Sequence, residues 1–378
     1  MIKILLGSLL VAVIAVLYTP VSMFLTVGGA LKTHSNINTA TCRNVHDPLL
    51  VGCENGQLHP ESGIIYYACA IHLDERDAWF PPTDHMNKSL ASHGGIIAFD
   101  TKTETAVQLE FDSAVVEGFA PHGLGIYFDS TDPQAVYIHA VNHRHSGSVV
   151  EIFKHILGAT TLEHIETAHN PEILYNPNDV HSVGPRSFYA SNDRGSRSYF
   201  AKISETLLAL KWGHVVYYHD GKWSVAAKNM AFPNGVSGSK DSVHIYVVSV
   251  GDASLSIFKR RTNGSLKLVD FVKLPAIPDN IAVDPKTEEI YIGAIGNALK
   301  WLYYVTDHTI AIPGNVLKIS PNEGTDKFYG KKYSIEAMLE TDGTQYSSFT
   351  SAIPDPTTHK LFLAGLYEHG LFVCNKMV

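Results

Sequence analysis

The sequence is poor in charge and contains no run of basic residues. Only 17% of its 378 residues are charged, and the formal net charge at pH 7 is −8. A protein that binds nucleic acid through the phosphate backbone needs clustered Lys and Arg to neutralise it. The composition therefore excludes nucleic acid as a partner.

Long helical periods are also missing after residue 31. The chain instead consists of short runs rich in Val, Ile and Tyr, separated by Gly, Pro, Asn and Asp. Typical runs are Ile64–Ala70, Val136–Val141 and His244–Ser249. Short runs bounded by turn residues are typical of β-strands, so we expect an all-β fold.

Cysteines are few, and their spacing is too irregular for a zinc site. The four are Cys42, Cys53, Cys69 and Cys374. An even number without metal-ligand spacing favours disulfides, which form in oxidising compartments. Two Asn-X-Ser glycosylation acceptors, at Asn87 and Asn263, are consistent with the secretory pathway.

The N-terminal segment carries the longest apolar run of the chain. The 27 residues from Ile4 to Ala30 include no charged side chain, and about 20 residues suffice to cross a bilayer. Residues 1–31 are predicted to form a signal-anchor or transmembrane helix, with the rest of the chain lumenal or extracellular. A cleaved signal peptide and a secreted protein remain the alternative, because small residues end the run.

One short phrase recurs through the middle of the chain. Each copy starts with proline and leads into an apolar run, and the prolines of successive copies are 56, 56 and 45 residues apart. The copies are Pro121-His122-Gly123, Pro177-Asn178-Asp179, Pro233-Asn234-Gly235 and Pro278-Asp279-Asn280. This period suits four-stranded propeller blades, and residues 32–378 have room for six.

The residue after each proline is expected to face the central axis. Innermost strands of successive blades line the axial channel, so equivalent positions converge there. Asn178, Asn234, Asp279 and Asn280 would then form a ring of oxygen ligands, which suits calcium rather than zinc. Each phrase taken singly is also an ordinary turn.

A single segment, Ser198–Trp212, has helical character, with apolar side chains near one face. We expect it to be an excursion between blades. Its apolar face would lie on a membrane or roof the site.

The same stretches resemble the serum paraoxonase/arylesterase family over nearly the whole chain. They include Gly52–Gly56, Pro121–Leu124, Val141–His143, Pro177–Asp179, Phe232–Gly235 and Asp279–Pro285. The resemblance implies a six-bladed β-propeller that holds two calcium ions in its axial channel. It also implies hydrolysis of lactones and aryl esters, with organophosphate triesters as a side activity of some members.

Site residues follow from the resemblance position by position. The catalytic calcium would be held by Glu54, Asn178, Asn234, Asp279 and Asn280. The structural calcium would be held by Asn55, the backbone carbonyl of Leu124, and Asp179. His122 and His143 match the catalytic histidine pair, Cys42 and Cys374 match the terminal disulfide, and Asn263 matches a glycosylated position.

Three departures from the family pattern affect the expectations. Asn55 replaces an aspartate, so the structural site has one negative charge fewer and a lower expected affinity. Ile295 stands where a histidine lines the substrate site. Cys53 and Cys69 are additional cysteines that flank the run Ile64–Ala68, and we expect them to form a second disulfide beside Glu54.

The chemistry expected of this site is calcium-assisted hydrolysis. The sequence has no Gly-x-Ser-x-Gly nucleophile elbow, whereas calcium can polarise a carbonyl oxygen without a serine nucleophile. His122 would accept a proton from water with His143 behind it, and Glu54 or Asp279 are the alternative bases. The alternative function is a catalytically idle or strictosidine-synthase-like propeller that serves as a binding module.

Overall fold

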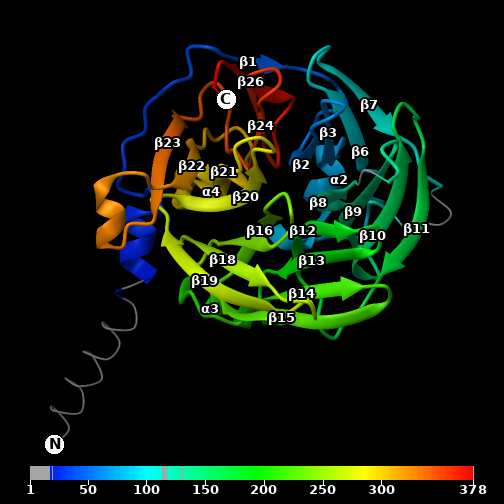
Figure 1. The fold of residues 1–378 in the computed structure, drawn as a ribbon, viewed down its shortest axis with the longest axis horizontal. Coiled ribbons are helices and arrows are strands. Elements are labelled where there is room, and N and C mark those ends of the chain that lie inside the picture. Colours follow the sequence, from blue (N-terminus) through cyan, green and yellow to red (C-terminus); the bar gives the residue numbers. More distant parts are fainter. Residues whose placement is uncertain (1–17, 19, 113–115, 117, 129–130, 378) are drawn as a thin grey trace, which may run out of the picture.

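A computed structural model describes residues 18, 20–112, 116, 118–128 and 131–377. Its strands form six four-stranded antiparallel sheets arranged in a ring (Figure 1). In each sheet one strand lies innermost, beside the innermost strands of the neighbouring sheets. The predicted six-bladed β-propeller is confirmed.

Three blades make up the first half of the ring, each with its strands ordered from the inside outward. Blade one consists of β2 (Cys53–His59), β3 (Ile64–Cys69), β6 (Gly95–Asp100) and β7 (Thr105–Leu109). Blade two consists of β8 (Pro121–Tyr127), β9 (Ala135–Arg144), β10 (Gly147–Ile156) and β11 (Leu162–Ala168). Blade three consists of β12 (Pro177–Gly184), β13 (Ser187–Asn192), β14 (Gly213–His219) and β15 (Lys222–Met230).

The second half of the ring follows the same pattern. Blade four consists of β16 (Pro233–Gly238), β17 (His244–Ser249), β18 (Ser254–Arg260) and β19 (Leu266–Lys273). Blade five consists of β20 (Ile277–Val283), β21 (Ile290–Ile295), β22 (Gly314–Pro321) and β23 (Tyr333–Thr341). Blade six consists of β24 (Ser351–Asp355), β25 (Lys360–Ala364), β26 (Leu371–Asn375) and β1 (Cys42–Val45).

The remaining elements lie in the connections between strands. They are α2 (Leu73–Ala78), β4 (Trp79–Phe80), η1 (Pro81–Thr83), β5 (His85–Met86), α3 (Tyr199–Leu207), α4 (Ala298–Tyr304) and η2 (Thr325–Tyr329). Residues 20–26 are also helical.

Blade six closes the ring with strands from both ends of the chain. β1 pairs antiparallel with β26, and this register places Cys42 opposite Cys374. The two cysteines form a disulfide, as expected. The second expected disulfide, Cys53–Cys69, joins β2 to β3 at the entrance to blade one.

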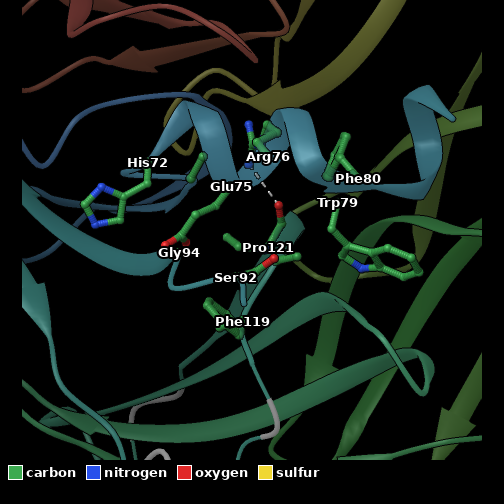
Figure 2. Close-up of a pocket in the computed structure, with 11 residues that line it drawn as sticks. His72, Glu75, Arg76, Trp79, Phe80, Ser92, Gly94, Phe119 and Pro121 are labelled. Atoms are coloured by element: carbon green, nitrogen blue, oxygen red, sulfur yellow. Dashed lines mark hydrogen bonds between the residues drawn. The ribbon is translucent and has the colours of Figure 1, made fainter. Parts of the chain in front are cut away.

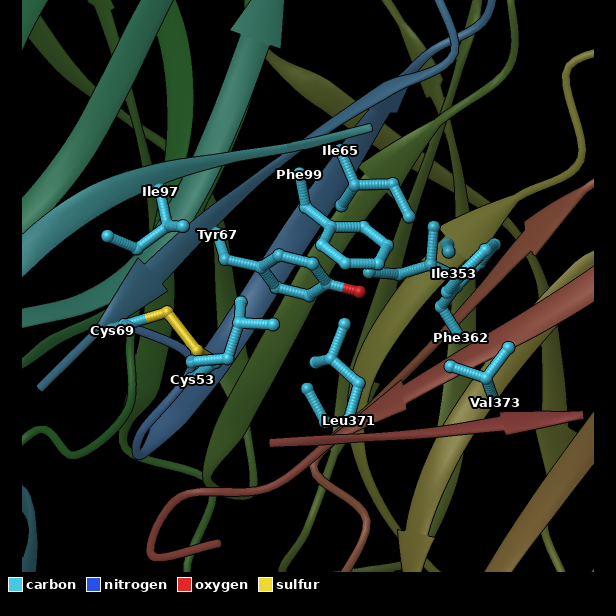
Figure 3. Packing of buried hydrophobic residues seen from close by; sticks show 13 residues of the cluster. Cys53, Ile65, Tyr67, Cys69, Ile97, Phe99, Ile353, Phe362, Leu371 and Val373 are labelled. Atoms are coloured by element: carbon cyan, nitrogen blue, oxygen red, sulfur yellow. A yellow bond between two sulfur atoms is a disulfide. The ribbon is translucent and has the colours of Figure 1, made fainter. Parts of the chain in front are cut away.

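The core consists of separate apolar layers between the faces of neighbouring blades. Figure 3 shows the layer between blades one and six, where Tyr67 and Phe99 meet Ile353, Phe362 and Leu371. All five side chains are buried, and full burial of an apolar side chain contributes about 1.5–3 kcal/mol. These layers fix each innermost strand relative to the next.

The helix α3 corrects one expectation. It joins β13 to β14, the second and third strands of blade three, so it is an excursion within a blade and not between blades. The hydroxyl of Ser198 caps the helix by accepting a hydrogen bond from the backbone N–H of Ala201. Its apolar side chains Phe200 and Leu207 are 81% and 66% exposed.

The predicted N-terminal membrane helix falls mainly outside the described residues, which omit 1–17 and 19. Within the described ranges, no helix is both long and apolar enough to cross a bilayer. The membrane anchor therefore stays a prediction.

A buried histidine in the wall between two blades makes the fold sensitive to acid. His139 of β9 is fully buried, and its Nδ1 lies 2.7 Å from the hydroxyl of Ser182 in β12. Burial lowers the pKa of His139 from 6.5 to about 3. Below pH 6.5 the unfolded chain therefore takes up a proton that the folded protein rejects, and stability falls.

We expect His139→Asn to weaken this acid sensitivity, since Asn can keep the contact with Ser182 but cannot titrate. Between pH 7.5 and pH 5 the variant should lose about 2 kcal/mol less unfolding free energy than the wild type. Urea unfolding at the two pH values measures the difference. His219→Asn is the matched control, because His219 also contacts a serine hydroxyl, that of Ser187, but is 57% exposed. Equal pH dependence of His139→Asn and the wild type would contradict the prediction.

Candidate active site

A cavity of about 450 Å³ lies over the beginnings of the innermost strands. Its polar floor comes from five blades, and its upper walls are mostly apolar. The floor residues are Glu54, His122, Asn178, Asn234 and Asp279. A cavity of this size with a few convergent polar groups is typical of a small-molecule site.

The floor side chains sit where the regular strand pairing is interrupted. Innermost strands β2, β8, β12, β16 and β20 each have a register shift at the predicted ligand position. Such a bulge interrupts the regular alternation of side chains along a strand and changes the direction in which they point. The recurring phrase of the sequence therefore marks the bulge that turns its polar residue into the channel.

Glycine in the phrase permits close approach between neighbouring innermost strands. A Cβ on Gly123 would lie 2.3 Å from Cα of Asp179, and one on Gly235 would lie 2.6 Å from the carbonyl oxygen of Asp279. Any side chain at these two positions would push the strands apart and widen the ring of floor residues.

Four buried oxygens of the residues predicted to hold the catalytic calcium have no hydrogen-bond partner within the described part of the chain. They are Oε2 of Glu54 and Oδ1 of Asn178, Asn234 and Asn280. Buried oxygens normally accept hydrogen bonds, so a convergent unpaired set needs an explanation. A hard cation supplies one, because calcium binds carboxylate and amide oxygens. The described residues include no group of three His, Cys, Asp or Glu side chains suited to a metal, and three of the four unpaired oxygens belong to amides.

The ionised forms of the buried carboxylates at the floor are unfavourable without a cation. Burial raises the pKa of Glu54 to about 7, against the opposing effects of its hydrogen bond from Asn280 and the positive charge of Arg76. The pKa of Asp279 is raised well above its usual value, first by burial and then by the charge of Glu54. A divalent cation between them would offset both charges.

The residues predicted for the structural calcium are engaged with one another. Nδ2 of Asn55 donates to Oδ1 of Asp179 at 2.7 Å, and Oδ1 of Asn55 accepts from the N–H of Gly56. Oδ2 of Asp179 accepts from the N–H of Val236 at 2.8 Å. Leu124 follows in β8 and is fully buried. A cation at this level would therefore compete with Asn55 and Val236 for the carboxylate of Asp179.

The two predicted histidines form a hydrogen-bonded chain beside the floor. Nδ1 of His122 lies 3.0 Å from Nε2 of His143, whose Nδ1 lies 2.8 Å from the hydroxyl of Ser148. On the other side, Nε2 of His122 lies 3.7 Å from Oε1 of Glu54. Burial keeps the pKa of His122 well below its usual value, and the pKa of His143 is lowered to about 3 for the same reason. Both rings are therefore neutral at pH 7.

A loop of blade one supports the histidines from outside the channel. It carries α2, β4 and β5, and Figure 2 shows its side chains Arg76, Trp79 and Phe80. The buried Arg76 guanidinium donates to the backbone carbonyls of Gly52, Leu366 and Pro121, which flank the site in three blades. Phe80 meets the rings of His122 and His143 edge-on, and Trp79 donates to the carbonyl of His143.

Sequence reasoning did not identify Arg76, Phe80 or Thr350. The hydroxyl of Thr350, just before β24, donates to the carbonyl of Glu54 at 2.6 Å. Blade six lacks the proline phrase, and Thr350 lies 71 residues after Asp279, outside the spacing of the repeat, so the repeat offered no signal for it. Arg76 and Phe80 lie outside the repeat, which therefore offered no signal for them.

Ile295 lines the cavity, as the resemblance implied. The predicted glycosylation acceptors Asn87 and Asn263 are both exposed, away from the core layers. Their positions are compatible with glycans.

Comparison with solved structures shows likeness to other propellers. The chain matches a luciferin-regenerating enzyme with a TM-score of 0.53 at 10% identity, covering 90% of this chain and 95% of that one. It matches a PQQ-bound aldose sugar dehydrogenase from Streptomyces coelicolor with a TM-score of 0.53 at 12% identity, covering 91% and 98%. At such low identity these likenesses establish the fold alone.

Sequence comparison identifies the family. A family model described as Arylesterase matches residues 83–373. The chain is 30% identical over 358 residues to serum paraoxonase/arylesterase 2 of Rattus norvegicus, covering 92% of this chain and 94% of the relative. It is 28% identical over 352 residues to serum paraoxonase/lactonase 3 of Mus musculus, covering 91% and 92%. The chain therefore belongs to the arylesterase family.

Proposed function

We propose that this arylesterase hydrolyses aryl esters and lactones with a calcium ion held by Glu54, Asn178, Asn234, Asp279 and Asn280. Its relatives bear the names arylesterase and lactonase, and the protein is an esterase and lactonase of the same family. The calcium requirement is supported by the four unpaired oxygens at the channel floor. These oxygens are the observation that carries the proposal.

When bound, the ion would polarise the carbonyl oxygen of the substrate and offset the negative charge that develops there. Around it, the apolar walls, among them Phe80 and Ile295, hold the aryl or alkyl part and exclude water. Without the cation, the buried carboxylates of Glu54 and Asp279 would repel the oxyanion that forms from the neutral substrate. Hydrolysis is therefore expected to depend on the ion more than substrate binding does.

His122 is the proposed proton acceptor. If Nδ1 of His122 donates to Nε2 of His143, and Nδ1 of His143 donates to Ser148, then Nε2 of His122 carries no proton and can accept one from water. Once protonated, that nitrogen lies 3.7 Å from the Glu54 carboxylate, which stabilises the positive charge. His143 acts as a positioning residue that holds the ring of His122 in this tautomer. Glu54 and Asp279 remain the alternative bases.

The test is hydrolysis of phenyl acetate and a δ-lactone before and after chelation. We expect EDTA to abolish both activities and added Ca²⁺ to restore them. Mg²⁺ should restore little, because it demands a smaller octahedral site and loses water reluctantly. Activity that survives exhaustive chelation would disprove the calcium mechanism, and an absence of hydrolysis by the calcium-loaded protein would favour a binding module.

A second, structural ion at Asn55, Leu124 and Asp179 is proposed to bind more weakly than the first. It would compete with Asn55 for the Asp179 carboxylate, and Asn55 brings no charge. We therefore expect Asn55→Asp to raise the affinity of the second site by about tenfold or more, since affinity follows the number of charged ligands. Calorimetric titration of the calcium-free protein measures both sites. Two ions of equal affinity in the wild type, or no gain in the variant, would contradict this.

We also propose that the protein is a membrane-anchored or secreted glycoprotein of the secretory pathway. Its two disulfides require an oxidising compartment. The uncharged residues 4–30 support an anchor, and Asn87 and Asn263 would carry the glycans. The exposed apolar side chains of α3 would lie at the membrane surface beside the cavity, where Leu207 forms part of the wall.

A further inference from the structure

The helical residues 20–26 form one wall of the cavity. Five apolar side chains of this segment line it, namely Pro20, Val21, Met23, Phe24 and Leu25. Trp301 and Leu302 of α4 and Leu207 of α3 line the same cavity. The apolar upper part of the substrate cavity is therefore built partly from a segment that lies outside the propeller repeat.

The chain directly after this helix is fixed to the start of α4. The N–H of Ala298 donates to the carbonyl of Gly28 at 2.8 Å, and the side chain of Asn297 donates to the carbonyl of Gly29 at 3.0 Å. Asn297 also caps α4 by accepting from the N–H of Lys300. Asn297 thus holds both the start of α4 and the N-terminal segment in place.

Gly29 allows this docking because it has no side chain. Its φ is +69°, and a Cβ at this position would lie 1.8 Å from the carbonyl oxygen of Gly296. Both Gly28 and Gly29 are buried. A side chain at position 29 must therefore separate the segment from α4.

Beyond the glycines the chain is held to the edge of blade five. Lys32 forms an ion pair with Glu340 at 2.9 Å, and Ile37 forms a β-bridge with the same residue. These contacts fix the C-terminal side of the docked segment. The position of residues 20–26 over the cavity is consequently set by the fold of residues 28–37.

We propose that the helical segment 20–26, docked through Gly29, is a specificity element of the enzyme that favours esters and lactones with long apolar chains over compact ones. This inference rests on the proposed function. It requires that these residues remain in the mature protein, since removal of the segment at its Gly28–Ala30 end would open the apolar wall.

The test compares two valine substitutions at left-handed glycines in the full-length protein, in one detergent. Gly29→Val should undock the helix, whereas Gly330→Val is the matched control, because Gly330 has a φ of +92° and a Cβ there meets nothing within 4 Å. We expect Gly29→Val to lower the ratio of kcat/KM for phenyl decanoate to that for phenyl acetate by about tenfold. The control should keep the wild-type ratio, and both variants should keep the wild-type calcium affinity.

Phe24→Ala provides a second test that leaves the docking glycines intact. This substitution shortens one side chain of the wall. The ratio of kcat/KM for phenyl decanoate to that for phenyl acetate should therefore fall, through a change in KM rather than in kcat. A wild-type ratio in both Gly29→Val and Phe24→Ala would overturn the proposal. So would an intact-protein mass showing that an enzyme with the wild-type preference for long chains begins after Ala30. The affinity for a long-chain methyl ketone, which is not hydrolysed, measures the contribution of the wall to binding without turnover. Calorimetric titration gives this affinity. Failure of the proposed function is distinguished by an absence of chelation-sensitive hydrolysis in the wild type.

Discussion

Replacement of Asp279 by Ala is expected to lower kcat/KM for phenyl acetate by about 10³-fold or more. The side chain supplies one of the two carboxylates among the predicted ligands of the catalytic calcium, and the remaining predicted ligands apart from Glu54 are neutral amides. Loss of that carboxylate removes much of the attraction for a divalent cation. His143→Ala should cost far less, about tenfold, because His143 acts only through His122. Steady-state kinetics at saturating calcium measure both effects.

Asp279→Asn separates the charge of this residue from its shape. Burial and the charge of Glu54 both raise the pKa of Asp279, so in the calcium-free protein its ionised form destabilises the fold. The Asn variant should therefore melt at a higher temperature than the wild type without calcium, at pH 7.5, and should gain less when calcium is added. Thermal melts with and without EDTA give the comparison. Small, equal losses of activity in Asp279→Ala and His143→Ala would instead indicate a binding role for the site.

The repeat in the sequence was sufficient to locate most of the channel floor, because proline fixes the start of four of the six innermost strands and the bulge beside it fixes the direction of the next side chain. His122, Asn178, Asn234 and Asp279 meet at the cavity for this reason. The ligand roles, by contrast, came from family resemblance and stay predictions.

The parts of the site that escaped prediction come from irregular connections. Arg76 and Phe80 belong to a loop whose path depends on long-range contacts, such as the bonds from Arg76 to carbonyls of three blades. No local pattern specifies contacts of this kind. The same reason explains why α3 was expected between blades: helical periodicity reveals a helix but not the strands that it connects.

The two disulfides are expected to differ in what they stabilise. Cys42–Cys374 spans 332 residues and Cys53–Cys69 spans 16. By loop-closure entropy, the first stabilises the folded protein by about 6 kcal/mol and the second by about 3 kcal/mol. The Cys42→Ala/Cys374→Ala double variant should therefore lose about twice the unfolding free energy of the Cys53→Ala/Cys69→Ala double variant, measured by urea unfolding under identical conditions.

The two disulfides should affect calcium affinity in the opposite order, so that loss of Cys53–Cys69 has the larger effect. Cys53 precedes Glu54 at the bulge of β2, so its disulfide fixes the strand on which the Glu54 carboxylate is presented. The terminal disulfide instead joins the outer strands β1 and β26 of blade six, which contribute nothing to the cavity lining. We expect loss of Cys53–Cys69 to weaken calcium binding by about tenfold, while loss of Cys42–Cys374 leaves the affinity of the folded protein unchanged. Parallel losses of stability and affinity in both variants would show that ring closure, and not local anchoring of Glu54, positions the ligand.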